Sequence, residues 1–183
     1  MPRKYKKAYG SHRPLKTVKY SNETYNITNT ISIASGGYIY TPLVSASDVQ
    51  GVRKAKNFTL KVFYAGITPL MFVLAYVPEN QKPQAINRGS SEGAVSLYEP
   101  NQNVIMSGYI TPSYNAMQTF RTRLARNLNS GDTIQMILAP AAATDAVVQQ
   151  LIGISLNYAI HTHTHTELHE MMAAPSFHFR SVL

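Results

Sequence analysis

From about Glu23 onward, apolar side chains recur at every second position, the spacing expected of a strand with one buried face. Residues 57–66, NFTLKVFYAG, place Phe58, Leu60, Val62 and Tyr64 on one face and Thr59, Lys61 and Phe63 on the other. Residues 151–160, LIGISLNYAI, place Ile152, Ile154, Leu156, Tyr158 and Ile160 inward and Gly153, Ser155, Asn157 and Ala159 outward. No segment carries a convincing amphipathic helical pattern of about twelve residues. The chain is therefore predicted to be all-β.

Eight segments have this alternation or a continuous apolar run, and Gly-, Pro- and Asn-rich turns such as ASGG, AGITP, PSYN and NLNSGD separate them. We predict strands over residues 24–34, 36–44, 57–66, 69–77, 103–111, 119–128, 132–140 and 151–160. A chain of 183 residues can bury one sizeable core. Eight strands with loops of uneven length in one domain predict a single antiparallel eight-stranded sandwich, and a jelly roll in particular.

The positive charge is concentrated before the first strand. Residues 1–20 hold seven of the seventeen Lys and Arg residues, and the first acid is Glu23. The remainder of the chain is almost neutral, a pattern typical of a module that grips a polyanion through a tail. We divide the chain into a basic nucleic-acid-binding arm (1–22), a jelly-roll domain (23–166) and a C-terminal tail (167–183). The tail is rich in large apolar residues, so we expect it at an interface.

Several function classes are excluded or disfavoured by what the sequence lacks. The absence of cysteine rules out disulfides, thiolate zinc clusters and cysteine nucleophiles. The longest strongly apolar run, residues 69–77, is too short to cross a bilayer as a helix. GSHRPLKT imitates a phosphate-binding loop, but Leu15 stands where glycine must precede the lysine. The nine acids form no obvious pair, so we expect no enzymatic activity and no cofactor.

The stretch AIHTHTHTELHE is the strongest candidate for a metal site. His161, His163 and Glu167 fit the H-x-H-x-x-x-E spacing of cupin metalloenzymes, but the glycines of that motif are absent and few residues follow for a second histidine strand. If the last strand continues without a bulge, His161, His163 and His165 extend its outward polar face. Same-face histidines can chelate a metal. We interpret the stretch as a polar strand end, with an opportunistic metal site at these three histidines as the alternative.

Two blocks, LYEPNQNVIMSGYIT (97–111) and RTRLARNLNSGDTIQMIL (121–138), resemble the capsid proteins of circovirus-like (CRESS) circular single-stranded DNA viruses. The flanking AYVPENQKP and GISLNYAI are similar to the same group, so the resemblance spans roughly residues 53–160. It implies a jelly-roll subunit, an icosahedral shell of sixty copies (T=1) and a basic arm facing the packaged genome. The arm here is shorter than the arginine-rich arms of circoviruses proper.

We therefore expect a capsid protein, found in the virion and, during assembly, in the host nucleus. Its partners would be copies of itself and single-stranded DNA. The candidate phosphate contacts are Arg3, Lys4, Lys6, Lys7, Arg13, Lys16 and Lys19 in the arm, and Arg53, Lys54 and Lys56 just before a strand. Arg121 and Arg123 share a strand face and suit either DNA or an ion-pair partner. The alternative is a monomeric single-strand-binding β-module with a basic tail; a cupin-like metalloenzyme is a more distant one.

Overall fold

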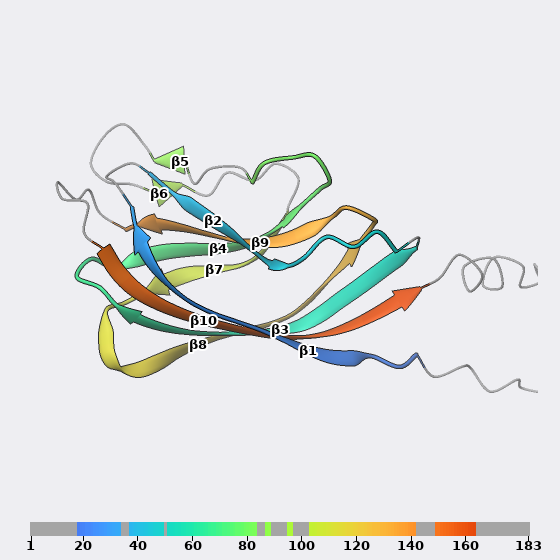
Figure 1. Ribbon diagram of the computed structural model, residues 1–183, viewed down its shortest axis with the longest axis horizontal. Coiled ribbons are helices and arrows are strands. Elements are labelled where there is room, and N and C mark those ends of the chain that lie inside the picture. The colour runs from blue at the N-terminus through green and yellow to red at the C-terminus, as the bar shows by residue number, and fades with distance from the viewer. Residues whose placement is uncertain are drawn as a thin grey trace, which may run out of the picture.

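The computed structural model describes residues 18–33, 37–49, 51–83, 87–88, 95–96, 103–141 and 149–163. Eight strands form a two-layered sandwich (Figure 1). They are β1 (Ser21–Ser32), β2 (Ile39–Val44), β3 (Val52–Ala65), β4 (Leu70–Val77), β7 (Val104–Ile110), β8 (Ser113–Leu128), β9 (Thr133–Pro140) and β10 (Gln149–His163). Two further short strands, β5 (Asn87–Arg88) and β6 (Val95–Ser96), pair with each other. No helix among the described residues is long and apolar enough to span a membrane.

The strand order identifies the fold as a jelly roll. The first sheet has the order β1-β10-β3-β8 and the second has the order β2-β9-β4-β7, with every pairing antiparallel. Except from β4 to β7, each connection between these eight strands crosses from one sheet to the other, and the last strand returns to pair with the first. This is the double Greek-key arrangement of jelly rolls. The predicted eight-stranded jelly-roll sandwich is confirmed.

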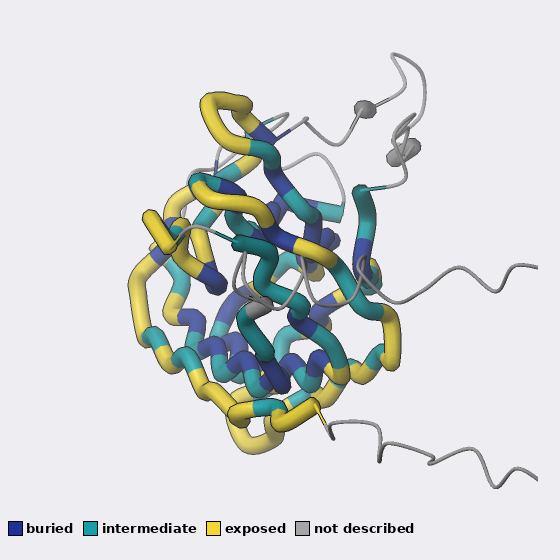
Figure 2. Tube along the Cα trace, turned by 90° about the vertical axis from the view of Figure 1, so that its right-hand side faces the viewer, coloured by how far each residue is buried: buried dark blue, intermediate teal, exposed yellow. Residues whose placement is uncertain are grey.

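The core lies between the two sheets, where the buried residues gather in Figure 2. The alternation predicted for β3 and β10 is confirmed, because the inward residues of both strands are buried: Phe58, Leu60, Val62 and Tyr64 on β3, and Ile152, Ile154, Leu156, Tyr158 and Ile160 on β10. Ala159, predicted to face outward, is also buried. Its short side chain lies between Asn22 and Lys56, which pair with it on the two neighbouring strands and are long enough to cover it.

The strands β4 and β9 are buried on both faces. Their core-facing residues join the main cluster, and a second buried cluster lies on the opposite face, formed by Met71, Val73, Ala75, Ile137 and Ala139. The continuous apolar run PLMFVLAYV reflects this double burial, which removes the period of two. Figure 1 places the short β5–β6 ribbon on the side of the second sheet that faces away from the core.

Two strands, β3 and β8, start at least five residues earlier than the sequence predicts. β3 begins at Val52, so Arg53, Lys54 and Lys56 lie within the strand and not just before it. Asn57 adopts a φ of 58° at a register shift. The inward residues Ala55 and Phe58 are therefore three positions apart, so the alternation of period two is interrupted within the continuous strand. β8 begins at Ser113, inside the predicted PSYN turn, because the turn is confined to residues 111–112.

The buried Tyr64 predicts a loss of stability at alkaline pH. Its hydroxyl donates to the Thr68 carbonyl oxygen at 2.8 Å and also bonds Gln150 Oε1, and burial raises its pKa to about 12. An unfolded tyrosine releases its proton near pH 10, so the free energy of unfolding should fall as pH rises from about 10 to about 12. In urea unfolding across this range, Tyr64→Phe should show a smaller decline than the parent. An equal decline in both proteins would contradict this assignment.

Candidate nucleic-acid interface

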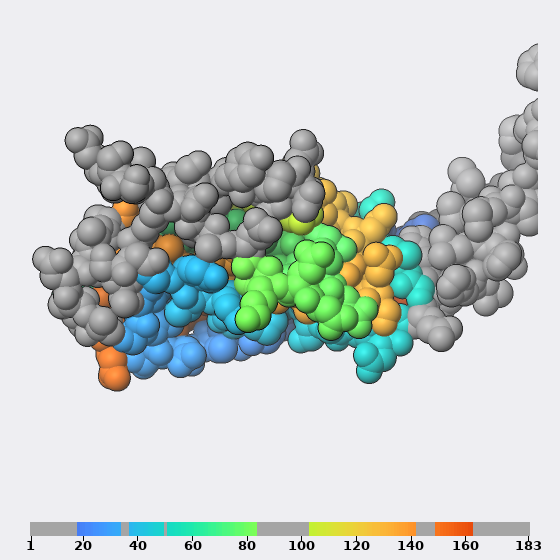
Figure 3. All heavy atoms as spheres, turned by 90° about the horizontal axis from the view of Figure 1, so that it is seen from above, coloured from blue at the N-terminus to red at the C-terminus, as the bar shows by residue number. Residues whose placement is uncertain are grey.

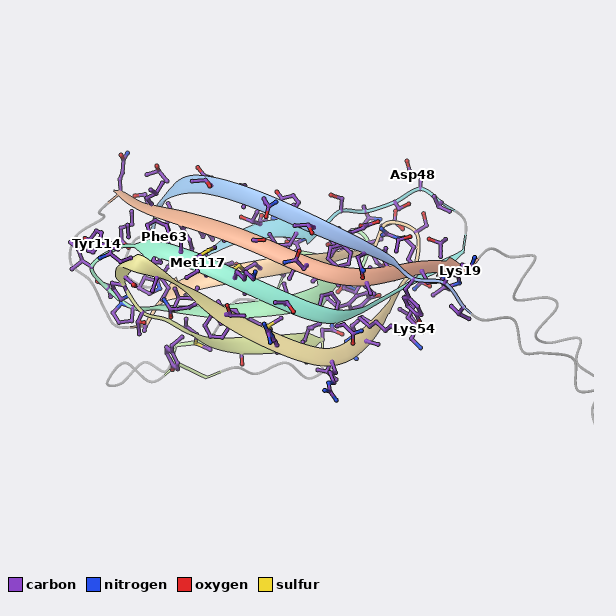
Figure 4. The ribbon with its side chains drawn as sticks, turned by 90° about the horizontal axis from the view of Figure 1, so that it is seen from below. Lys19, Asp48, Lys54, Phe63, Tyr114 and Met117 are labelled. Atoms are coloured by element: carbon purple, nitrogen blue, oxygen red, sulfur yellow. The ribbon has the colours of Figure 1, made fainter. Side chains whose placement is uncertain are left out.

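The cations predicted near the first strand gather at one end of the sandwich. The chain enters β1 there, and the beginning of β3 pairs with the end of β10, with Lys54 opposite His161 and Lys56 opposite Ala159. Figure 4 shows Lys19 and Lys54 at this end, together with the loop that carries Asp48. Residues that are far apart in the sequence therefore meet at the root of the basic arm.

Tyr20 connects the root of the arm to the sheet. The Lys56 Nζ atom lies 3.6 Å from the centroid of the Tyr20 ring, close enough for a cation–π interaction. The His161 ring is tilted against the same tyrosine, with ring centroids 5.6 Å apart. His161 Nδ1 is 2.7 Å from the Lys19 carbonyl oxygen; because a carbonyl oxygen only accepts, Nδ1 carries the hydrogen and donates it. These contacts fix where the arm leaves the body.

Arg53 lies on the opposite face of β3 from Lys54 and Lys56. Its guanidinium donates to two backbone carbonyl oxygens, that of Ser45 at 3.1 Å and that of Asp132 at 3.2 Å. It thereby links the loop after β2 to the turn before β9. The geometry gives Arg53 a structural role in joining the two sheets at this end.

The buried Asp132 holds two loops at the same end. Its carboxylate accepts from the Asn129 backbone N–H at 2.7 Å, the Tyr76 hydroxyl at 2.7 Å and the Glu79 backbone N–H at 3.1 Å. Burial, and then the hydrogen bond and charge of Asp132, raise the pKa of Tyr76 to about 12. Figure 3 shows the segment after β4, in green, against the orange turn that leads into β9. The Asp132 carboxylate therefore has a structural role, because it accepts hydrogen bonds from the loop after β4 and from the turn before β9.

Of the predicted phosphate contacts, Lys19, Arg53, Lys54 and Lys56 are described, and all four lie at this end. The six remaining arm residues, Arg3, Lys4, Lys6, Lys7, Arg13 and Lys16, lie outside the described residues. The C-terminal tail, 167–183, also lies outside them. Lys56 and Lys54 face away from the core, whereas Arg53 turns toward the second sheet. The structure thus separates the cations of β3 into two groups that the sequence could not distinguish.

The histidine prediction is tested only in part. β10 pairs with β1 without a register shift, so the strand continues unbroken and His161 follows the outward face of Ser155 and Asn157, as predicted. The side chain of His163 and the whole of His165 lie outside the described residues. Within the described part of the chain, no three His, Cys, Asp or Glu side chains come close enough to hold a metal ion. The cupin-like alternative rests on residues beyond it.

Arg121 and Arg123 both line an open depression of about 470 Å³ on β3 and β8, together with Asn57, Phe58, Thr59 and Thr122. Sequence reasoning noted that the two arginines share a face but not that they adjoin β3. It also missed Lys61, an exposed cation on the same side of the sheet. The alternation of Thr59, Lys61 and Phe63 is the signal that identifies Lys61 as outward-facing.

No family model matches this chain, and no curated protein matches it. Among solved structures it is similar to the Gx strain of infectious bursal disease virus, with a TM-score of 0.46 and 9% identity over 86% of this chain and 36% of the other. For the structure of the Gt strain of that virus, the TM-score is 0.38 and the identity is 6%, over 86% of this chain and 42% of the other. For a mutant VP2 protein of the virus, in derived T=1 particles, the TM-score is 0.35 and the identity is 8%, over 91% of this chain and 45% of the other. The chain thus spans less than half the length of each. The fold assignment rests on strand order and register.

Proposed function

We propose that this chain is a viral capsid protein that assembles into a small icosahedral shell of sixty copies and packages circular single-stranded DNA through its basic arm. The observation that carries the proposal is the position of the arm root, which Tyr20, Lys56 and His161 hold at the cationic end of a jelly roll. The jelly-roll strand order and the resemblance of residues 53–160 to circovirus-like capsid proteins support it. The virion is the proposed location, with the host nucleus as the site of assembly.

The proposed binding mode is electrostatic. Lys and Arg side chains neutralise phosphates and release counterions, which gives affinity without reading sequence. The proposed contacts are Arg3, Lys4, Lys6, Lys7, Arg13, Lys16, Lys19, Lys54 and Lys56. Arg53 was predicted as a further contact and lies at the same end of the sandwich, but its guanidinium already donates to two carbonyl oxygens. We therefore assign the outward-facing Lys54 and Lys56 the larger contribution from the body.

The alternative, a monomeric single-strand-binding module, must account for apolar side chains at the end opposite the arm root. Ile67 is 72% exposed, Tyr114 is 69% exposed, and Tyr109 and Met117 are each 56% exposed. Figure 4 shows Tyr114 and Met117 together at that end, far from Lys19 and Lys54. Large apolar groups that gather exposed at one end of a molecule often mark an interface. Contacts between copies would bury them, whereas a monomer leaves them in water.

Sedimentation velocity on the purified chain separates the two functions. The capsid function predicts a fast, homogeneous boundary from closed particles, and the alternative predicts a single species near 20.3 kDa. Ile67→Ser combined with Tyr114→Ser should abolish the fast boundary while leaving the circular dichroism spectrum unchanged, because both side chains are exposed. Val49→Ser, which alters a 51% exposed residue of the loop after β2, is the control and should still assemble. A parent protein that stays monomeric at all concentrations would refute the proposal.

A further inference from the structure

The outward face of the first sheet carries a line of cations that begins at the arm root. Lys56 pairs with Ala125, Lys61 pairs with Thr119, and Arg121 pairs with Thr59, so these cations project from the same face of β3 and β8. Arg123 is two positions from Arg121 and shares its face. We call Lys54, Lys56, Lys61, Arg121 and Arg123 the cationic track. From Lys54 to Lys61 it spans about 20 Å at the usual rise of a strand.

An irregularity in the sheet opens the middle of the track. From Lys56 to Thr59, β3 advances three residues while its partner β10 advances two. From Thr122 to Ala125, β8 advances three residues while its partner β3 advances two. Asn57 takes its positive φ at this point. The open depression that Arg121 and Arg123 line lies at this point, where Asn57, Phe58 and Thr122 also line it. Bulges of this kind commonly re-aim side chains beside binding sites.

The surroundings of the track favour an anion. Among the described residues of the first sheet, Glu23 is the single acid, and it accepts a hydrogen bond from the buried Tyr158 hydroxyl at 2.5 Å. Small polar residues occupy several outward positions of this sheet, including Thr24, Asn26 and Thr28 on β1 and Ser155 and Asn157 on β10. Hydroxyl and amide groups of this type donate to phosphate and sugar oxygens. Phe63, which is half-buried, continues the outward row of β3 beyond Lys61, and aromatic side chains beside cations are the type on which unpaired bases stack.

We propose that the cationic track is a second nucleic-acid site, which guides the phosphate backbone of single-stranded DNA across the body after it leaves the arm. The proposal rests on the proposed function and extends it from the arm to the first sheet. The observation behind it is that the arm and the track are continuous. Tyr20, at the root of the arm, makes a cation–π contact with Lys56, which is a member of the track. Because this face then meets the genome, it faces the interior of the shell.

The test measures binding of a fluorescent thirty-nucleotide oligo-dT to the full chain by anisotropy, as a function of NaCl concentration. Each lost phosphate contact lowers the slope of log affinity against log salt by about 0.7 for a single strand. Arg121→Gln with Arg123→Gln should therefore lower it by about 1.4, and adding Lys61→Gln should lower it further. Arg121→Lys with Arg123→Lys keeps both charges and should keep the slope. Unchanged thermal unfolding of each variant establishes that the fold is intact.

The control, Lys82→Gln with Arg88→Gln, removes the same charge from segments associated with the second sheet and should leave the slope unchanged. A glutamine pair at 121 and 123 that behaves like this control overturns the track. So does a pair that weakens binding of a heparin fragment but leaves the oligo-dT slope intact, because the ligand is then a sulfated polysaccharide. If the track fails while Lys4, Lys6 and Lys7 still contribute to the slope, the proposed function survives. A parent that does not bind oligo-dT overturns both.

Discussion

Replacing Lys4, Lys6 and Lys7 together with alanine is expected to leave particles that close normally but contain far less DNA than the parent. The three lysines supply three of the seven arm cations and no core residue. The salt slope of single-strand binding should fall by about 2, at about 0.7 for each lost phosphate contact, with no change in sequence preference. Absorbance at 260 and 280 nm of nuclease-treated particles measures the packaged DNA.

The control for this variant is Lys82→Ala, which removes a charge from the segment after β4. It should package as the parent does. A triple variant that packages full-length DNA as well as the parent would show that the arm does not bind the packaged DNA. The proposal that this chain packages DNA through its arm would then be wrong. Particles that fail to close would equally contradict it, because the arm would then be part of the assembly interface.

Charge counting predicts that the arm does not act alone. Seven arm cations in sixty copies amount to about 420 positive charges, fewer than the roughly 550 nucleotides that encode this chain by itself. A complete genome must also encode replication functions. Cations of the body and bound counterions are therefore expected to supply the remainder, and Lys54, Lys56 and the rest of the cationic track are the described residues placed to contribute.

Asp132→Ala is expected to lower the free energy of unfolding by about 3 kcal/mol, because it leaves two buried backbone N–H groups and the Tyr76 hydroxyl without their acceptor. The side chain is 4% exposed, so water does not readily replace it. Urea unfolding of the unassembled subunit measures the change. Asp48→Ala, at an exposed acid of the loop after β2, is the control and should change the free energy by less than about 0.5 kcal/mol.

Two results would contradict this account of Asp132. A loss below about 1 kcal/mol would mean that the Asn129 and Glu79 N–H groups find other acceptors when the loops rearrange. Tyr76→Phe removes one of the three donors without leaving a buried polar group unpaired on the tyrosine, so it should cost clearly less than Asp132→Ala. An equal cost for both would place the effect in the hydroxyl and not in the two loops.

The sequence predicts the eight strands because burial on one face imposes a period of two, as in Phe58, Leu60, Val62 and Tyr64. It misplaces the start of β3 because one residue, Asn57, takes a left-handed conformation and shifts the pattern. It misses β5 and β6 because two-residue strands carry no periodic signal. Local patterns thus identify regular pairing well, while single-residue irregularities are visible only in the fold.

The candidate site was predicted in outline. Charge clustering identifies the arm, and the sequence proposes Lys54 and Lys56 as further phosphate contacts; their position beside the arm root is seen only in the fold. The sequence gives no sign that Arg53 turns to the opposite face and donates to two carbonyl oxygens, because that depends on the register shift at Asn57 and on a loop 79 residues away. The cationic track was equally hidden, since β3 and β8 become neighbours only through the jelly-roll order.

Electron microscopy of the purified chain, combined with extraction of nucleic acid after nuclease treatment, tests the central claim most directly. The capsid function predicts closed icosahedral particles of uniform size, and nuclease-resistant DNA inside them that is single-stranded and circular. Protein that remains as single subunits with nuclease-sensitive DNA on its surface would contradict the capsid function and favour the monomeric binding module.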